Sequence, residues 1–162
     1  MNQFQMVSDC LKKNGISYQI VEHKPALSTE EADSYIKGID GVRTKTMFLT
    51  NKKKTAYYLL VMDDKKRLDM KKLKDILHEN RIKLASEQSL MLKMGVVSGV
   101  VSIFGLLNNK DKDIQVLFDN EIINEPRMCF HPNVNDKTIF LNTNDVFKFI
   151  KAIGFNYNIV NI

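Results

Sequence analysis

The chain has 162 residues, of which 44% are hydrophobic and 27% are charged, a composition that excludes a disordered or fibrous protein. The net charge is +5 and lysine outnumbers arginine by 20 to 4, so the surface permits a polyanionic partner without requiring one. Cys10 and Cys129 match no metal-ligand or redox spacing, and no apolar run approaches membrane-spanning length. We therefore expect one cytoplasmic domain over residues 1–162, with free thiols, no metal and no association with a membrane.

Apolar periodicity, capping residues and turn residues predict five helices and seven strands. Ser28 followed by Glu31, for example, resembles a capping box and predicts the start of the second helix. The expected helices cover residues 2–14, 28–37, 69–77, 86–95 and 142–154. The expected strands cover residues 18–21, 43–51, 56–62, 82–85, 114–118, 128–131 and 138–141. Because hairpins are mixed with intervening helices in this order, we predict a single α+β domain whose mixed sheet is flanked by helices.

The strand over residues 43–51 carries the first candidate functional residue, Lys45. Side chains alternate along a strand, so Lys45 lies on the same face as Met47 and Leu49, while Thr46 faces the other way. An ammonium group on an apolar face must reach water at the sheet edge, bind an anion or lose its proton, because an unpaired buried charge is costly. A strand-end lysine that reaches water and a lysine in a binding site both fit this pattern.

A glycine-rich segment over residues 95–109 is almost uncharged and follows neither the helical nor the strand period. One interpretation is a helix C-cap at Gly95 followed by tight packing of the backbone against the sheet. The other is a cradle of exposed backbone N–H groups for a phosphate, a carboxylate or a carbonyl oxygen. Both interpretations remain open at this point.

Common catalytic motifs are absent: the sequence has no Walker loop, dinucleotide fingerprint, nucleophile elbow or paired Cys and His ligands. His23 and His131 stand at expected strand ends, each closely followed by a proline. A histidine in that position often only fixes a turn through one hydrogen bond, so a catalytic role does not follow from position alone.

Taken in order along the chain, these pieces resemble the YbaK/ProX group of aminoacyl-tRNA deacylases, which is related to the editing domain inserted in bacterial prolyl-tRNA synthetases. The family pattern has Glu-His-x-Pro, a threonine shortly before Glu-Glu-Ala, an essential lysine at the start of a strand, a glycine-rich loop ending in Phe-Gly-Leu, and Phe-His-Pro with a downstream Asn. In this sequence the pattern is carried by Glu22–Pro25, Thr29–Ala32, Lys45–Leu49, Gly95–Leu106 and Phe130–Asn135.

The resemblance implies the α+β editing-domain fold and hydrolysis of the ester that joins a wrong amino acid to tRNA, in the first place alanine on tRNA(Pro), by attack of water and without a cofactor. It implies Lys45 as the catalytic residue. The substrate-binding residues that it implies are Thr46, Gly99, Ser102, Phe104, Gly105 and His131. The implied partner is the 3' acceptor end of tRNA, with prolyl-tRNA synthetase or an elongation factor as candidates for a second partner.

One departure from the family pattern keeps alternatives open. The family loop usually reads Gly-x-x-x-Pro, and this chain has Ile103 where the proline would follow Gly99. Isoleucine leaves the loop less pre-organised and adds an N–H group. The alternatives are removal of Cys or Ser from tRNA, a non-catalytic protein that binds tRNA 3' ends or another ligand, and a hydrolase of simple amino-acid esters. Similarly, Lys52–Lys54 in the expected hairpin turn either keep the turn soluble or contact phosphates.

Overall fold

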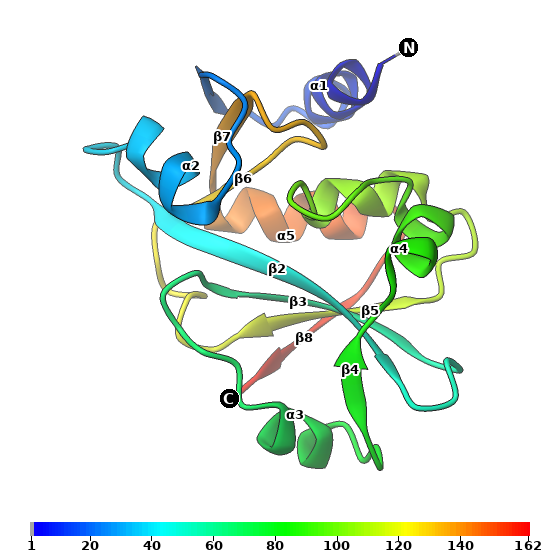
Figure 1. Cartoon of the computed structure of the whole chain (residues 1–162). Coiled ribbons are helices and arrows are strands. Elements are labelled where there is room, and N and C mark those ends of the chain that lie inside the picture. The colour runs from blue at the N-terminus through cyan, green and yellow to red at the C-terminus, as the bar shows by residue number, and fades with distance from the viewer. Residues whose placement is uncertain (1) are drawn as a thin grey trace.

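A computed structural model describes residues 2–162, and a mixed eight-stranded sheet lies at its centre (Figure 1). The strand order is β1-β7-β6-β2-β3-β5-β8, and β4 pairs with β2. The pairs β2–β6, β3–β5 and β5–β8 are parallel and the others are antiparallel, which confirms the predicted mixed sheet. The strands are β1 (Gln19–Glu22), β2 (Val42–Asn51), β3 (Tyr57–Asp63), β4 (Ile82–Leu84), β5 (Ile114–Asp119), β6 (Arg127–Phe130), β7 (Lys137–Asn142) and β8 (Tyr157–Val160).

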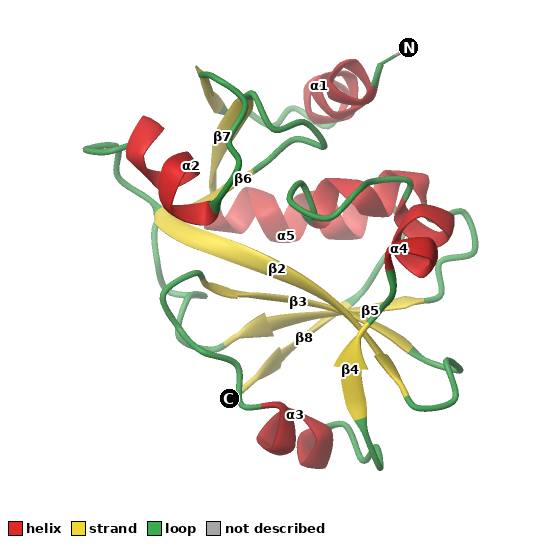
Figure 2. Cartoon of the chain, in the orientation of Figure 1, coloured by secondary structure: helices red, strands yellow, loops and turns green. Residues whose placement is uncertain are grey.

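Five α-helices and one 3₁₀ helix surround the sheet (Figure 2). They are α1 (Gln3–Lys13), α2 (Thr29–Tyr35), α3 (Met70–Ile76), α4 (Glu87–Met94), η1 (Ile103–Asn108) and α5 (Thr143–Ala152). The predicted caps are confirmed, since the Ser28 hydroxyl accepts from the Glu31 N–H at 3.1 Å and the Asp69 carboxylate accepts from the Lys72 N–H at 3.0 Å. Each cap satisfies a donor that the first helical turn leaves without a partner.

The two faces of the sheet bury separate cores. On one face, Phe48 of β2 belongs to a large cluster that includes Phe104 and Phe149, beneath α4, η1 and α5. On the other face, Leu49 belongs to a smaller cluster with Leu73 of α3. Neighbouring residues of β2 thus enter different cores, and the predicted alternation along this strand is confirmed.

The structure corrects the prediction in two places. No strand was expected after the last helix, yet β8 adds to the sheet beside β5. The residues Phe155, Tyr157 and Ile159 alternate with asparagines, so the strand period is present in the sequence and the prediction overlooked it. The segment over residues 95–109 was expected to be irregular, but it contains η1, whose three-residue turns leave no helical period in a short stretch. Within residues 2–162, no helix combines the length and the apolar character that a membrane span requires.

The edge of β2 that faces β6 and β4 is interrupted, and this interruption positions the site. Val42 and Arg43 pair with β6, whereas residues 49–51 pair with β4. Residues 44–47 lie between these two ladders and have no strand partner on this edge within the described chain. In Figure 1, α2 lies beside the first half of β2 and α4 beside its second half.

Candidate active site

A cavity of about 330 Å³ opens at the interruption of the sheet. That volume lies at the lower end of the range for small-molecule sites. Its walls come from distant parts of the chain: residues 29–36 of α2 and its C-cap, residues 44–48 of β2, residues 84–90 around the start of α4, residues 98–102 of the glycine-rich segment, and residues 129–131 at the end of β6, together with Thr138.

Lys45 lines this cavity at the unpaired edge of β2 and is half-buried. Its neighbours Thr44 and Thr46 also line the cavity, although they point to the other face of the strand. The Thr44 hydroxyl donates to the Cys129 carbonyl at 2.6 Å, which ties β2 to β6 where their ladder ends. None of the ion pairs formed by residues 2–162 involves Lys45, so its ammonium group is available to a bound anion or carbonyl oxygen.

The glycine-rich segment forms the wall opposite β2. Gly95 ends α4 in the left-handed conformation with φ of 64°, and Gly99 turns the chain again with φ of 95°. Gly99 is exposed and lines the cavity, whereas Ser102 is buried and lines it more deeply. The Ser102 hydroxyl accepts from the Phe104 N–H at 3.2 Å and so begins η1. Gly99 therefore supplies a backbone turn that a non-glycine residue would adopt only with strain.

Phe104 and Gly105 do not line the cavity but lie behind this wall. Phe104 is fully buried, with its ring centroid 4.9 Å from that of Phe149 and 6.0 Å from that of Phe130. A Cβ atom at Gly105 would lie 2.5 Å from the Met94 side chain and 3.3 Å from its Cβ, so glycine permits η1 to approach α4. The segment thus combines tight packing at Gly105, against α4 and not against the sheet as predicted, with an exposed turn at Gly99.

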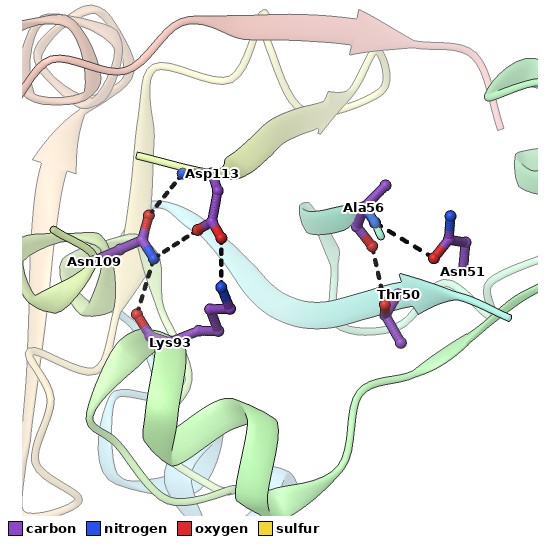
Figure 3. A network of polar contacts seen from close by, with 6 residues as sticks. All are labelled: Thr50, Asn51, Ala56, Lys93, Asn109 and Asp113. Carbon is purple, nitrogen blue, oxygen red and sulfur yellow. Dashed lines mark hydrogen bonds and ion pairs between the residues drawn. The ribbon is translucent and has the colours of Figure 1, made fainter. Parts of the chain in front are cut away.

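Polar contacts close the base of the glycine-rich segment (Figure 3). The Asn109 amide donates to the Lys93 carbonyl at 3.1 Å and to the Asp113 carboxylate at 3.0 Å, and its oxygen accepts from the Asp113 N–H at 3.2 Å. The Lys93 ammonium group also pairs with Asp113. These contacts join the end of α4 to the end of η1, so both ends of the segment are fixed. Figure 3 also shows the β2–β3 hairpin, where the Thr50 hydroxyl donates to the Ala56 carbonyl at 2.9 Å.

His131 follows β6 and lines the cavity. Its Nδ1 lies 3.3 Å from the Lys137 carbonyl, an acceptor, so Nδ1 carries a proton and Nε2 is left as an acceptor in the neutral ring. Burial lowers the pKa of His131, which keeps the ring neutral at physiological pH. Two residues later, the buried Asn133 adopts φ of 62° and donates to the Phe104 carbonyl at 3.2 Å, joining this turn to η1.

The α2 wall holds a carboxylate that the sequence analysis missed, Asp33. Three residues of α2 and its C-cap line the cavity at positions i, i+3, i+4 and i+7, namely Thr29, Ala32, Asp33 and Ile36. That spacing marks one helix face and was a signal available in the sequence. The Asp33 carboxyl lies close enough to Asp64, which follows β3, to act on its charge. Burial first, and the neighbouring Asp33 second, raise the pKa of Asp64 to about 7, so Asp64 is partly protonated near neutral pH.

The structure therefore brings together five of the seven predicted site residues: Lys45, Thr46, Gly99, Ser102 and His131. The remaining two support the wall from behind. His23 lies outside the cavity, stacked on Tyr35 at 5.0 Å, with its Nε2 accepting from the Thr138 hydroxyl at 2.9 Å. Thr138 itself lines the cavity, so His23 contacts the site through that hydroxyl, and it also contributes to the lowered pKa of His131.

Comparison with known proteins connects this cavity to a family. Residues 23–149 match the model of the aminoacyl-tRNA editing domain, a range that includes every residue lining the cavity. The chain belongs to the aminoacyl-tRNA editing domain family. The YbaK/ProX resemblance is confirmed, and the function of this family is aminoacyl-tRNA editing.

Individual relatives of this editing domain agree with the assignment. The chain is 31% identical to the prolyl-tRNA editing protein ProX of Acetoanaerobium sticklandii, covering 100% of this chain and 99% of the relative. It is 27% identical to the mouse prolyl-tRNA synthetase associated domain-containing protein 1, covering 90% and 88% of the two chains. A solved structure of a candidate trans-editing enzyme for prolyl-tRNA synthetase has the same fold, with a TM-score of 0.75 at 15% identity, over 99% of this chain and 96% of that one.

Proposed function

We propose that this editing domain hydrolyses the ester of a small amino acid wrongly attached to tRNA(Pro), with alanine as the first substrate. The observation that carries the proposal is the cavity itself, because it gathers Lys45, the exposed turn at Gly99 and a neutral His131 around one small space. The full-length similarity to a prolyl-tRNA editing protein supports the choice of tRNA.

The two ends of the cavity differ in exposure, and this difference orients the substrate. At the α4 end, Leu84, Glu87 and Gly99 are exposed, so that end opens to solvent. At the α2 end, Ile36 is 2% exposed and Thr138 is 3% exposed, so they form a closed floor there, while Thr29 is exposed at the rim. A tRNA enters through the open end, which places its terminal adenosine near Gly99 and the amino acid at the closed end.

The chemistry requires a water molecule, a positioned ester and donors for the oxyanion that forms as water attacks. Backbone N–H groups around Gly99 and the Lys45 ammonium group can supply those donors without a protein nucleophile. Neutral His131 offers Nε2 to orient the water or to line the amino-acid pocket. A ribose hydroxyl of the substrate can assist the proton transfer, so the mechanism needs no general base from the protein.

A separate editing enzyme is needed because a synthetase discriminates only weakly against smaller amino acids. A synthetase site that accepts a larger amino acid rejects a smaller one by only about 10- to 200-fold for each missing methylene, and a second hydrolytic site is the usual remedy. A small closed end in the editing site selects in the opposite direction from the synthetase site, because it admits small acyl groups and excludes large ones. In this proposal the protein acts in the cytoplasm, where charged tRNA is used.

The rest of the tRNA acceptor end would contact the protein mainly through phosphates. Lys52–Lys54 are exposed in the β2–β3 turn and are the first candidates for such contacts. We therefore expect the affinity for tRNA to fall as salt is added. Prolyl-tRNA synthetase or an elongation factor would deliver the substrate if the isolated domain discriminates poorly among tRNAs.

The test is single-turnover hydrolysis of Ala-, Cys-, Ser- and Pro-tRNA(Pro) by the natural protein, by Lys45→Ala and by the matched control Lys148→Ala, which alters an exposed lysine of α5. We expect rapid loss of the alanyl ester, a decrease of at least about 100-fold in Lys45→Ala, the size reported for loss of one oxyanion donor, and no change in the control.

Other outcomes of the same experiment separate the alternatives. Preference for the cysteinyl or seryl ester would reassign the substrate within the family. Full turnover by a folded Lys45→Ala protein would contradict the mechanism. Binding of charged tRNA without hydrolysis of any ester would replace the proposal with a binding function, in which Ile103 marks the altered loop.

A further inference from the structure

The closed end of the cavity contains a charged group for which the proposed hydrolysis has no role so far. Among the residues that line the cavity, the ionisable carboxyl groups are Asp33 and Glu87, and they lie at opposite ends. Glu87 is exposed near the mouth, where its carboxylate lies 3.5 Å from the Ser98 N–H. Asp33 is half-buried beside Ile36 and close enough to His131 to influence its charge.

We propose that the Asp33 carboxylate binds the α-ammonium group of the aminoacyl ester at the closed end of the cavity. The inference rests on the proposed function, because an aminoacyl ester differs from other small esters by this one cation. An α-amino group is mostly protonated at pH 7. A cation that leaves water for a closed cavity requires a compensating anion, since burial of an unpaired charge is costly.

The surroundings of Asp33 leave its carboxylate free for this role. None of the salt bridges among residues 2–162 includes Asp33 or Asp64. The Arg43 guanidinium group is directed elsewhere, because it donates to the Gly41 carbonyl at 2.7 Å and to the Ile36 carbonyl at 2.8 Å. A free carboxylate on the cavity-lining face of α2 is therefore open to a substrate cation.

Asp64 orients that carboxylate. The Asp64 N–H donates to the Arg43 carbonyl at 2.8 Å, which fixes this residue at the end of β3. With its pKa raised to about 7, Asp64 is partly protonated at neutral pH, and in that form it can donate to one oxygen of Asp33 and leave the other oxygen to the substrate. The other ionisable groups that act on the pair or respond to it are Asp63, Lys65, Cys129, His131 and the Arg43 guanidinium.

Asp33 would then be a determinant of specificity for amino-acid esters, separate from Lys45. Lys45 would bind the ester and the 3' end, and these features are common to any acylated tRNA. Asp33 serves the amine, which only an unmodified aminoacyl group carries. A substrate that keeps the ester but replaces the amine with a hydroxyl group distinguishes these two roles.

The experiment compares alanyl-tRNA(Pro) with lactyl-tRNA(Pro), in which a hydroxyl group replaces the amine at nearly the same size. We measure kcat/KM for the natural protein, for Asp33→Asn and for the matched control Glu87→Gln. In Asp33→Asn we expect the alanyl value to fall by about ten- to a hundredfold, the range for one hydrogen bond to a charged group, and the lactyl value to change by less than about threefold. In Glu87→Gln the ratio of the two values should stay at that of the natural protein.

Equal losses for both esters in Asp33→Asn would overturn the inference, because a structural role predicts no distinction between amine and hydroxyl. No loss for either ester, or a changed ratio in Glu87→Gln alone, would also overturn it. A natural protein that hydrolyses neither ester refutes the proposed function, and a binding measurement then tests Asp33 by itself. Its probes are the non-hydrolysable amides of 3'-amino-3'-deoxyadenosine with alanine and with lactate. Asp33→Asn should weaken only the alanyl amide, and equal affinities for the two amides would overturn the inference.

Discussion

The two long walls of the cavity are built in different ways. The glycine-rich wall stands on the main core, because Ser102, Ile103 and Phe104 are buried and Asn109 closes its base. The α2 wall is one short helix that rests on a small cluster formed by Ile36, Cys129 and Phe140. A wall that is part of the main core is held rigidly, which suits the positioning of an ester. A wall that rests on a separate small cluster can change its residues in size and charge with a smaller loss of fold stability. We therefore expect mutations in the first wall to reduce turnover and stability together, and mutations in the second to change selectivity.

The largest effect is expected for Phe104→Ala, behind the glycine-rich wall. The change removes a fully buried ring that packs on Phe130 and Phe149, and it should lower the free energy of unfolding by about 3–5 kcal/mol. Ser102 and Gly99 lose their support, so kcat/KM for the editing reaction should fall by more than about tenfold even well below Tm. Thermal unfolding and single-turnover hydrolysis measure the two effects.

The control for this change is Phe147→Ala, which alters a half-buried ring of α5 stacked on Tyr157 at 4.5 Å and remote from the cavity-lining residues. It should lower Tm and leave kcat/KM unchanged. If Phe104→Ala kept full turnover at a temperature where it is folded, the glycine-rich wall would not depend on the core behind it.

A smaller loss of stability and a larger change of selectivity are expected for Ile36→Ala in the α2 wall. Ile36 is 2% exposed, and truncation should cost about 2 kcal/mol, the lower end for such a change, because its cluster lies apart from the main core. The closed end of the cavity also widens. Hydrolysis of a bulkier aminoacyl ester relative to the alanyl ester should then rise by about tenfold, the value of one additional methylene.

Leu73→Ala provides the comparison for that experiment, because Leu73 of α3 is fully buried against the opposite face of the sheet. It should reduce stability by a similar amount and leave the ratio of rates unaltered. Equal changes of the ratio in both variants would show that general loosening, and not the shape of the α2 wall, sets the selectivity.

The difference between the walls also explains what the sequence could predict. Lys45, Gly99 and His131 were predicted through the resemblance to the YbaK/ProX group, since the local pattern around each residue left its role open. Asp33 was missed although its helix face could be read, since its significance depends on Asp64, which lies on another element. The cavity itself results from two strands, β4 and β6, pairing with the same edge of β2 and leaving residues 44–47 between them. Such long-range pairing leaves no local signal, whereas β8 did leave one, because Tyr157 and Ile159 alternate with asparagines.

The smallest expected effect concerns the charge of the α2 wall and its dependence on pH. The pKa of Asp64 is raised to about 7 in the folded protein, against about 3.9 for an unfolded aspartate. The folded state therefore binds more protons than the unfolded state between about pH 4 and pH 7, and this contribution to stability is lost as the pH rises through that range. Asp64→Asn does not titrate, so it should be more stable than the natural protein at pH 8 and equal to it near pH 4.

Because Asp64 is only half-buried, solvent screening limits the gain at pH 8 to about 1 kcal/mol, or roughly 2–4 °C in Tm for a domain of this size. Thermal unfolding at pH 4.5, 6 and 8 measures the trend, with Asp40→Asn at an exposed carboxylate as the control. A gain that is equal at all three pH values would mean that the amide improves packing and that the pKa of Asp64 is not raised. A gain that grows with pH would support the raised pKa, which burial and the neighbouring Asp33 together produce at the closed end of the cavity.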